Sequence, residues 1–294
     1  MTEPVRVAQV VGKMVGGGVE AVVMNYYRHI DRGKVQFDFL VDSDSTLVPR
    51  DEIESLGGRV FEIPPYQHVA EYQRELQRLI KQEGWKIVHS HINALSVFPL
   101  RAAKKAGVPV RIAHSHSTSG RGEYAKNALK AVLKTQSNRY PTHRFACSQF
   151  AGEWLFGKAA HFEVVYNAID LDRFRFNAEA RAQARADLGL VGNQFAIGHV
   201  GRFTAQKNHA FLIDVFAEVA KRRDDAVLLL VGTGEAGASV KALVDERGLT
   251  DRVKFLGQRS DVNRLYQAFD AFVLPSLYEG LCLVGVEAQV SGLP

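Results

Sequence analysis

The chain has few cysteines and no apolar stretch long enough to cross a membrane. Its two cysteines, Cys147 and Cys282, are too few for a disulfide framework or a cysteine-ligated zinc site. A membrane-spanning helix needs a run of about 18 apolar residues, and none is present. The first strand-like segment, Val5–Val11, follows the N-terminus without the layout of a signal peptide. With 46% apolar and 23% charged residues, the chain is expected to be an ordinary globular protein of the reducing cytoplasm.

Acidic residues are scarce in one region of the first half. Between residues 101 and 145 the chain has one acidic residue, Glu123, and ten basic residues: Arg101, Lys104, Lys105, Arg111, Arg121, Lys126, Lys130, Lys134, Arg139 and Arg144. Lys126, Lys130 and Lys134 recur every four residues, so on a helix they form one stripe. This stripe is either a solvated helix face or a dock for an anionic surface, such as phospholipid or a lipid-linked phosphate. Nucleic acid is not an expected partner, because no zinc finger, aromatic RNA-binding pattern or basic zipper helix accompanies the charges.

Short β-branched segments alternate with amphipathic stretches along the chain. The strand-like segments are Val5–Val11, Val35–Val41, Arg59–Glu62, Ile87–Ser90, Val110–His114, Arg144–Cys147, Glu163–Tyr166, Phe195–Val200, Ala226–Val231, Arg252–Leu256 and Ala271–Leu274. Helical patterns lie between them, for example Glu71–Gln82, Ala210–Lys221 and Ala238–Arg247. This alternation predicts an α/β protein with parallel sheets and helices on both faces. The charged interval 172–190 has no strand, so we expect two Rossmann-like domains, 1–170 and 171–294, facing a ligand cleft.

A glycine-rich loop follows the first predicted strand. Gly16, Gly17 and Gly18 stand directly before a helical pattern that includes Glu20. Glycines let a backbone approach a ligand closely, and the amides at a helix start attract anions. The loop therefore predicts a phosphate site, with a tight strand-to-helix turn as the alternative.

Four of the ten histidines stand at the ends of two predicted strands. His89 and His91 end one of them, and His114 and His116 end the next. Imidazoles there can donate to a phosphate or a sugar hydroxyl, or act as bases. A metal site is the rival interpretation, but no Cys or Glu is spaced to complete one, so no metal is expected. For at least two of the four, a buried histidine satisfied by hydrogen bonds is the alternative.

The second half offers cations at one turn and carboxylates at another. The segment Gly198–Asn208 follows a predicted strand, and its residues Arg202 and Lys207 lie close to the start of a helix. Cations and helix amides together form a clamp for a pyrophosphate, and a merely charged loop is the alternative. Glu279 falls in the loop after the last predicted strand, and Glu287 in the first turns of a helix. Because ionised carboxylates only accept hydrogen bonds, this pair suits a hydroxyl-rich ligand such as a ribose or a hexose.

Together these loops resemble the retaining glycosyltransferases of the GT-B fold in family 4, the glycosyl transferases group 1. The motifs that carry the resemblance are Gly16-Gly17-Gly18-Val19-Glu20, Val200-Gly201-Arg202 with Lys207-Asn208, Glu279-Gly280 with Glu287-Ala288, and Gly292-Leu293-Pro294. The run from Arg111 to His116 is similar to capsular and exopolysaccharide members of the family. The resemblance covers most of the chain and implies two Rossmann-like domains, with an acceptor-side domain first and a donor-nucleotide domain second.

The resemblance implies a role for each candidate residue. Arg202 and Lys207 would hold the donor diphosphate, and Glu287 the donor ribose. The residues that would hold the transferred sugar are Glu279, Gly280, Leu281, Cys282 and Leu283. Gly16, Gly17 and Gly18 would line the phosphate side of the site. His116, and after it His114, would contact the sugar near the reacting centre. No covalent nucleophile, metal or other cofactor is expected. The acceptor would attack the same face from which the diphosphate leaves, through an oxocarbenium-like transition state that is stabilised by charge and positioning.

The expected function is therefore that of a retaining, metal-independent hexosyltransferase. It would move a sugar from a nucleotide-diphosphate sugar, expected to be UDP-linked, to a lipid-linked or polysaccharide acceptor in capsule or exopolysaccharide assembly, in the cytoplasm or peripherally at the inner membrane face. A UDP-sugar epimerase of the same fold and a catalytically silent nucleotide-sugar-binding subunit are the alternatives. A nicotinamide oxidoreductase is disfavoured, because its glycine fingerprint is absent. Family members continue beyond the position of Pro294, so we expect a truncated second domain, with an exposed sheet edge that lowers stability.

Overall fold

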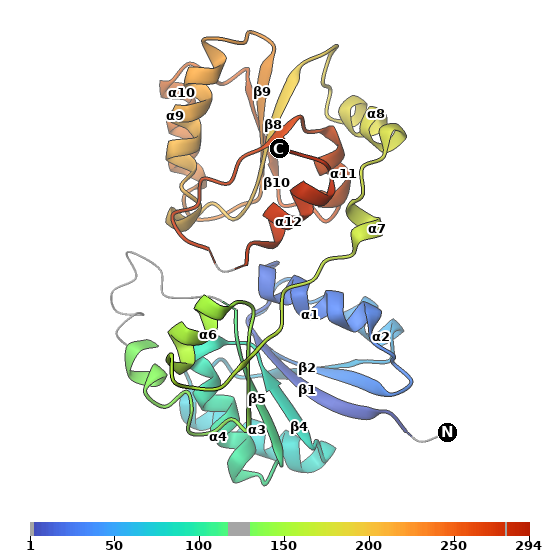
Figure 1. Cartoon of the computed structure of the whole chain (residues 1–294), viewed down its shortest axis with the longest axis vertical. Helices are drawn as coiled ribbons and strands as arrows, with labels where there is room; N and C mark the ends of the chain where they lie inside the picture. The colour runs from blue at the N-terminus through green and yellow to red at the C-terminus, as the bar shows by residue number, and fades with distance from the viewer. Residues whose placement is uncertain (1–2, 117–129, 280) are drawn as a thin grey trace. The chain divides into compact units, whose positions relative to one another are not determined.

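Two parallel sheets, each covered by helices, make up the structure. The computed structural model describes residues 3–116, 130–279 and 281–294. Contacts within the chain divide it into two compact units, Met1–Ala168 (unit 1) and Ile169–Pro294 (unit 2). Each unit has one wholly parallel sheet with helices on both faces (Figure 1), so the predicted α/β architecture is confirmed. Within the described ranges, no helix combines the length and the apolar character needed to span a bilayer.

The sheet of unit 1 has seven strands in the order β3-β2-β1-β4-β5-β6-β7. Its elements in chain order are β1 (Val5–Gly12), α1 (Gly18–His29), β2 (Val35–Asp42), α2 (Arg50–Ser55), β3 (Arg59–Ile63), α3 (Val69–Glu83), β4 (Ile87–Ser90), the 3-10 turn η1 (Asn93–Ser96), α4 (Val97–Lys105), β5 (Val110–Ser115), β6 (His143–Ala146), α6 (Gln149–Phe156) and β7 (Glu163–Val164). The strand order reverses between β1 and β4, so the loops after these two strands diverge at the carboxyl edge of the sheet. Such a switch point is where open α/β sheets bind ligands.

Helices cover the two faces of the unit 1 sheet differently. Side chains of α3 and α4 pack with Ala8 and Val10 of β1 in one core. Side chains of α1 and α2 pack with Phe39 and Val41 of β2 in the other. Because side chains alternate along a strand, Gln9 points to the face that carries α1. This alternation decides which residues of the neighbouring strands can reach Gln9.

The sheet of unit 2 has four described strands in the order β10-β9-β8-β11. The elements of this unit are α7 (Leu171–Phe174), α8 (Ala178–Asp187), β8 (Phe195–Val200), the 3-10 turn η2 (Ala205–Lys207), α9 (His209–Ala220), β9 (Ala226–Val231), α10 (Gly237–Glu246), β10 (Val253–Gly257), α11 (Val262–Ala268), β11 (Ala271–Phe272) and α12 (Leu283–Val290). The helices α9 and α10 cover one face, and α8, α11 and α12 lie on the other (Figure 1). The strand order reverses between β8 and β11, which places the switch point of unit 2 there.

The observed strands agree with most of the predicted ones, but two predicted segments end early. The prediction of Glu163–Tyr166 is wrong at its end, because β7 stops at Val164 and the carbonyl of Tyr166 accepts a hydrogen bond from the hydroxyl of Tyr26. The prediction of Ala271–Leu274 is wrong at its end, because β11 stops at Phe272. The carbonyl of Val273 accepts a hydrogen bond from Nδ1 of His199 (2.8 Å) instead of continuing the ladder. The interval 172–190 has no strand, as predicted, and carries α8 and most of α7.

Gly232 holds the loops after β8 and β9 against each other. Its φ is +133°, and a Cβ at this position would lie 2.1 Å from the carbonyl oxygen of Gly201. Next to it, the amide of Phe203 donates to the carbonyl of Thr233 (2.9 Å). Only glycine permits this conformation and this approach, so Gly232 helps to set the position of the loop that carries Arg202.

The substitution Gly232→Ala is expected to lower the free energy of unfolding by roughly 1–3 kcal/mol, because both the backbone angle and the contact with Gly201 become strained. Denaturant unfolding measures this loss. Gly237→Ala is the matched control, because a Cβ there would meet nothing within 4 Å and Gly237 begins α10. Equal stability of the two variants would contradict the account of Gly232.

Candidate functional site

The carboxyl edge of the unit 2 sheet brings two distant loops together. β8 and β11 pair directly, so the loop 201–208 lies beside the loop 273–279. Three hydrogen bonds join the loops: Leu277 N–H to the Gln206 carbonyl (2.9 Å), Gln206 Nε2 to the Tyr278 carbonyl (2.9 Å) and Asn208 Nδ2 to the Pro275 carbonyl (3.3 Å). The predicted diphosphate loop and the predicted sugar loop are therefore one surface at the switch point of the sheet.

An ion pair crosses this junction. Nζ of Lys207 lies 2.7 Å from Oε1 of Glu279, and the two side chains are only 16% and 22% exposed. The methylene groups of Lys207 lie against Gly201, where a Cβ would come within 3.3 Å of them. Partial burial makes this pair stronger than an ordinary surface pair. The predicted phosphate-binding cation and the predicted sugar-binding carboxylate thus neutralise each other in this structure.

The helix α9 begins at this loop without a side-chain cap. Asn208, the residue before α9, has a φ of 55°, and its side chain makes no capping hydrogen bond. The free amides of the first turn and the positive end of the helix dipole therefore lie next to Lys207. Arg202 is exposed on the same loop. Within the described part of unit 2, no hydrogen bond or ion pair joins Arg202 to Glu279 or Glu287. The loop offers two cations and helix amides, which suits a diphosphate.

Glu287 lies in the second turn of α12, where Tyr266 holds its side chain. The hydroxyl of Tyr266 donates to Oε2 of Glu287 (3.0 Å). Burial raises the pKa of the Glu287 carboxyl, while the Tyr266 hydroxyl and the charge of Arg173 act in the opposite direction. A half-buried carboxylate whose position is fixed by one donor can accept further hydrogen bonds with its remaining lone pairs.

Cys282 stands between Glu279 and Glu287 in the sequence, directly before α12. Burial raises the pKa of its thiol, on which the charges of Lys207 and Glu279 also act. The thiol in turn acts on Tyr266, the partner of Glu287. The candidate residues Lys207, Glu279, Cys282 and Glu287 therefore belong to one continuous neighbourhood. Of the other predicted sugar contacts, Leu281 is half-buried and Leu283 is buried at the start of α12, whereas Gly280 lies outside the described residues.

The glycine loop of unit 1 already holds an anion, and that anion is the side chain of Glu20. Its carboxylate accepts hydrogen bonds from the amides of Val15 (3.1 Å), Gly16 (2.6 Å) and Gly17 (2.8 Å). Gly18 is the first residue of α1. A phosphate bound at the amides of Gly16 and Gly17 would therefore have to displace Glu20.

Four imidazole rings form a patch on the α1 face of unit 1, in which His91, His114 and His116 are buried and His89 is partly buried. β4 pairs with β5 in parallel, so His89 and His91 stand beside His114 and His116. The ring centroids within each His-x-His pair are 4.0 Å apart. Burial lowers the pKa of His89 to about 3 and that of His116 to about 4, and burial and the neighbouring rings lower the pKa of His91 and His114 as well. The patch is therefore uncharged at neutral pH.

Hydrogen bonds occupy both nitrogens of His91 and one nitrogen each of His89 and His114, the three residues that could hold a metal ion. Nitrogens of His89, His91 and His114 lie within 4.8 Å of one another, as in a zinc site of histidines. However, both nitrogens of His91 are bonded, to His116 Nε2 (2.9 Å) and to Gln9 Oε1 (2.8 Å), and His89 Nε2 bonds His114 Nδ1 (3.2 Å). A metal ion bound to all three residues would have to break the hydrogen bonds of His91.

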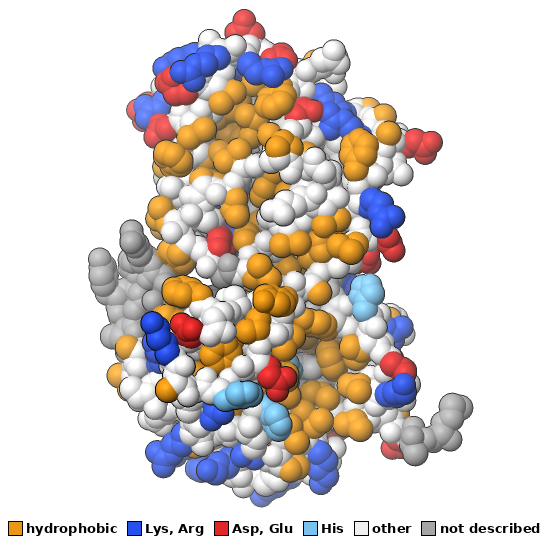
Figure 2. Space-filling view, viewed as in Figure 1, with side chains coloured by type: hydrophobic (Ala, Val, Ile, Leu, Met, Phe, Trp, Pro, Cys, Tyr) orange, Lys and Arg blue, Asp and Glu red, His pale blue; other side chains and the backbone are white. Residues whose placement is uncertain are grey.

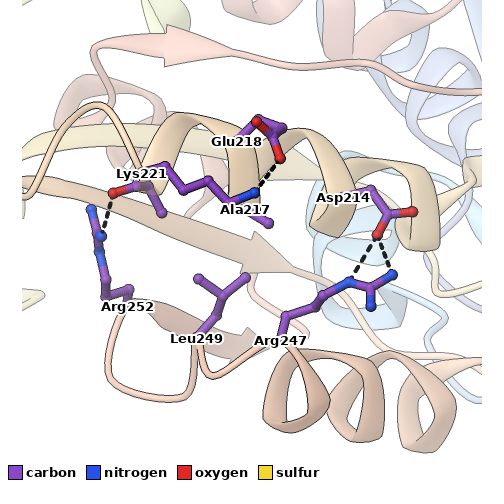
Figure 3. Close-up of a pocket in the computed structure, with 8 residues that line it drawn as sticks. Asp214, Ala217, Glu218, Lys221, Arg247, Leu249 and Arg252 are labelled. Atoms are coloured by element: carbon purple, nitrogen blue, oxygen red, sulfur yellow. Dashed lines mark hydrogen bonds and ion pairs between the residues drawn. The ribbon is translucent and has the colours of Figure 1, made fainter.

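A hollow of about 600 Å³ lies at the opposite, amino edge of the unit 2 sheet (Figure 3). Its charged side chains are already compensated. Arg247 pairs with Asp214 (2.8 Å), Lys221 pairs with Glu218 (2.6 Å), and Arg252 donates to the carbonyl of Ala220 (2.9 Å). Because ligands of parallel α/β sheets bind at the carboxyl edge, we do not assign the donor to this hollow.

The basic stripe of unit 1 is described only in part. Lys126 lies outside the described residues, and Lys130 and Lys134 lie on helical turns. Nζ of Lys134 lies 5.0 Å from the ring centre of Trp154, while the neighbouring Val132 is 61% exposed. Figure 2 shows further Lys and Arg side chains along the edge of unit 1 that carries α4 in Figure 1. An exposed apolar side chain among cations is typical of a surface that binds membranes.

Sequence reasoning missed the side chains that hold the candidate residues in place. Tyr266 and Gln206 secure Glu287 and the sugar loop, and Gln9 contacts His91. Each of these partners is distant in the sequence, and none stands in a motif that signals its role. The carboxyl-edge position of Gln206, between Arg202 and Lys207, was the one available signal.

Two family models match the chain. The model of Glycosyltransferase Family 4 matches residues 16–173, and the model of Glycosyl transferases group 1 matches residues 180–294. The chain is 39% identical to a putative glycosyltransferase EpsF of Bacillus subtilis, over 98% of this chain and 78% of that one. It is 32% identical to a UDP-Gal:alpha-D-GlcNAc-diphosphoundecaprenol alpha-1,3-galactosyltransferase of Escherichia coli, over 74% of this chain and 59% of that one.

Solved structures share the fold. Anabaena Alr3699/HepE in complex with UDP-glucose superposes with a TM-score of 0.81 at 23% identity, over 98% of this chain and 79% of that one. WaaG, a glycosyltransferase involved in lipopolysaccharide biosynthesis, gives a TM-score of 0.77 at 17% identity, over 99% of this chain and 80% of that one. At these identities the likeness establishes the fold, and the predicted GT-B class is confirmed.

The neutral histidine patch predicts how stability depends on pH. Because the folded pKa values of His89 and His116 lie below the ordinary value of 6.5, the unfolded chain binds more protons in acid. Stability should therefore be constant above about pH 7 and fall below pH 6.5, by roughly 1.4 kcal/mol per pH unit for each such histidine. Denaturant unfolding at fixed pH values measures this dependence.

In the variant His89→Gln, the free energy of unfolding should fall less steeply with decreasing pH, by the contribution of one histidine, roughly 1.4 kcal/mol per pH unit. His161→Gln is the control, because His161 is exposed, and it should leave the slope unchanged. A stability that rises between pH 7 and pH 5, or an equal slope in wild type and His89→Gln, would contradict the assignment.

Proposed function

The chain belongs to the glycosyltransferases of family 4, the glycosyl transferases group 1, and we propose that it is a retaining enzyme that uses a nucleotide-diphosphate sugar. The proposed donor site lies within unit 2, at the carboxyl edge of β8 and β11. The observation that carries the proposal is the Lys207–Glu279 ion pair across the two loops. A UDP-linked donor is proposed because the Escherichia coli relative is named for UDP-Gal and the Anabaena neighbour was solved with UDP-glucose.

In this proposal each group of the site has one task. Arg202, Lys207 and the amides of α9 receive the diphosphate, and Glu287 accepts the ribose hydroxyls. A diphosphate that approaches Lys207 competes with Glu279 for the ammonium group. Glu279 is then released to accept hydroxyls of the sugar, beside Cys282 and the other residues that precede α12. The ion pair thus keeps both side chains at the site until the donor exchanges their partners.

The chemistry we propose rests on charge and position. The cations and the helix dipole stabilise the negative charge that grows on the departing diphosphate. The acceptor then attacks the same face of the oxocarbenium-like sugar, held in place by the site. His116, with His114 second, would contact the sugar or the acceptor near the reacting centre. We propose no metal or other cofactor for this step, since lysine, arginine and helix amides provide the positive charge.

The acceptor we propose is a lipid-linked or polysaccharide glycan of a cell-surface polymer, assigned to unit 1. The name of the Escherichia coli relative specifies a diphosphoundecaprenol acceptor, and WaaG is described as acting in lipopolysaccharide biosynthesis. Such an acceptor is anchored in a membrane. A cytoplasmic enzyme that docks peripherally through Lys126, Lys130 and Lys134 would reach it, and the exposed Val132 among these charges supports the proposal.

Arg202→Ala and Glu287→Ala should each weaken the binding of UDP-glucose, by roughly 10- to 100-fold for Arg202, because a hydrogen bond to a charged phosphate contributes about 1.5–3 kcal/mol. Isothermal titration calorimetry measures the dissociation constant. Arg247→Ala, at the amino-edge hollow, is the control and should bind donor like the wild type. Unchanged affinity in both site variants would dismiss the site. Release of UDP only when an acceptor is added would separate transfer from epimerisation and from silent binding.

Charge reversal of the described part of the stripe should weaken membrane binding. Each basic residue near an anionic membrane surface contributes about 1 kcal/mol to binding. The double variant Lys130→Glu with Lys134→Glu should therefore bind phosphatidylglycerol vesicles with an association constant at least tenfold lower, as measured by co-sedimentation. Lys221→Glu, on the exposed end of α9 in unit 2, is the control. Equal sedimentation of the double variant and the control would refute the membrane dock.

A further inference from the structure

A buried histidine connects the two loops of the unit 2 site. His199, the last residue but one of β8, is 0% exposed. Its side chain lies on the α9 face of the sheet, because side chains alternate along a strand and Ile197 packs with residues of α9 in one core. A carbonyl oxygen only accepts, so Nδ1 of His199 carries a hydrogen and donates it to the carbonyl of Val273 (2.8 Å).

Both backbone groups of Val273 are therefore bonded to β8. Its N–H donates to the carbonyl of Gly198 (3.0 Å), and its carbonyl accepts from the ring of His199. Because β11 ends at Phe272, these two bonds fix the point at which the loop 273–279 leaves the sheet.

Neighbouring rings keep the His199 ring in this orientation. The ring centre of His209 lies 4.8 Å away with the two planes at 89°, and that of Phe272 lies 6.4 Å away with the planes at 13°. His209, the first residue of α9, stacks in turn on Phe203 at 4.1 Å. Because a buried ring in a close-packed interior has little room to turn, Nδ1 stays directed at Val273.

The opposite edge of the His199 ring faces the loop 201–208. A Cβ at Gly201 would lie 3.1 Å from Nε2 of His199 and 3.3 Å from the methylene groups of Lys207. Burial lowers the pKa of His199 to about 4, and the charge of Lys207 acts in the same direction, so the ring is neutral at pH 7. Within the described ranges Nε2 has no hydrogen-bond partner, which leaves the side chain with the single bond to Val273.

This bond lies deeper than the other contacts between the two loops. Gln206, Lys207 and Asn208, which bond the later part of the loop 273–279, are only half-buried. Water and ligands can compete for the bonds of half-buried groups, whereas they do not reach a fully buried one. When a donor exchanges the partners of Lys207 and Glu279, the bond from His199 to Val273 therefore remains.

We propose that His199 is a positioning residue that holds the loop 273–279, and with it Glu279, in place once the donor has broken the Lys207–Glu279 ion pair. The inference rests on the proposed function for the identity of the ligand, a nucleotide-diphosphate sugar. Because Glu279 is assigned to the transferred sugar, His199 would support the binding of the sugar portion and not that of the nucleotide. The site would thereby distinguish a sugar donor from the bare nucleotide diphosphate.

A matched pair of variants isolates the hydrogen bond. Asn and Leu have the same side-chain skeleton, and Nδ2 of Asn, like Nδ1 of His, is bonded to Cγ and can donate to Val273. His199→Leu should bind UDP-glucose about fivefold more weakly than His199→Asn, the effect of one hydrogen bond. The two variants should bind UDP equally, because UDP carries no transferred sugar for Glu279 to hold. Isothermal titration calorimetry on the full chain measures the four dissociation constants.

Equal affinities of the two variants for UDP-glucose would overturn the inference. An equal loss for UDP and UDP-glucose in His199→Leu would overturn it as well, because it would mean that His199 supports the whole site and not the sugar loop. A wild type that binds neither ligand would reject the proposed function, and the position of the loop must then be decided without a ligand.

Amide hydrogen exchange provides that second measurement. The N–H of Leu277 bonds the carbonyl of Gln206 (2.9 Å) across the two loops, and it should exchange about fivefold faster in His199→Leu than in His199→Asn, since the loop is held less firmly. The N–H of Leu228, which bonds the carbonyl of Arg252 (2.8 Å), is the control and should exchange equally in both. Equal exchange of Leu277 in the two variants would contradict the positioning role whether or not a donor binds.

Discussion

The ion pair between Lys207 and Glu279 is the interaction on which the site of unit 2 depends. The two residues are 72 positions apart, and only the reversal of strand order between β8 and β11 makes them neighbours. Glycines on the loops after β8 and β9 permit the close backbone contacts there, and three hydrogen bonds hold the loops 201–208 and 273–279 together. The fold thus places Lys207, Glu279 and the start of α9 together at the sheet edge, with Glu287 on α12, the helix that follows the same loop.

Both units place their candidate residues at the carboxyl edge of a parallel sheet, but they differ in the charge of these residues. In unit 2, Lys207, Glu279 and Glu287 are half-buried and Arg202 is exposed, so a ligand at the sheet edge can exchange the partners of these charged groups. In unit 1 the amides of the glycine loop donate to the Glu20 carboxylate, and desolvation lowers the pKa of the four strand-end histidines, so that they are uncharged at neutral pH. At the carboxyl edges of the two sheets, unit 1 therefore offers neutral hydrogen-bonding groups and unit 2 offers charge. This division suits a reaction in which a hydroxyl compound meets an activated sugar diphosphate.

The sequence was sufficient for the fold and for the loops that carry the candidate site. The predicted segments Ile87–Ser90, Phe195–Val200 and Ala226–Val231 match β4, β8 and β9. Ala226–Val231 is a continuous apolar run between turn residues, which specifies a buried parallel strand, and the other two segments are largely apolar. The sequence could not predict the partners of the candidate residues. The contact of Tyr266 with Glu287 and that of Gln9 with His91 depend on helix packing and strand register, which no local pattern encodes. For the same reason the sequence does not reveal that the Glu20 side chain accepts hydrogen bonds from the amides of Gly16 and Gly17, which it predicts to line a phosphate.

The central claim is that Lys207 and Glu279 act as one unit in binding the activated sugar. A double-mutant cycle on UDP-glucose binding, with Lys207→Met, Glu279→Gln and the double variant, tests it most directly. The account predicts that the two single losses do not add, with a coupling of at least about 0.5 kcal/mol, as for residues in direct contact. Additive losses, or an affinity that none of the three variants changes, would contradict it.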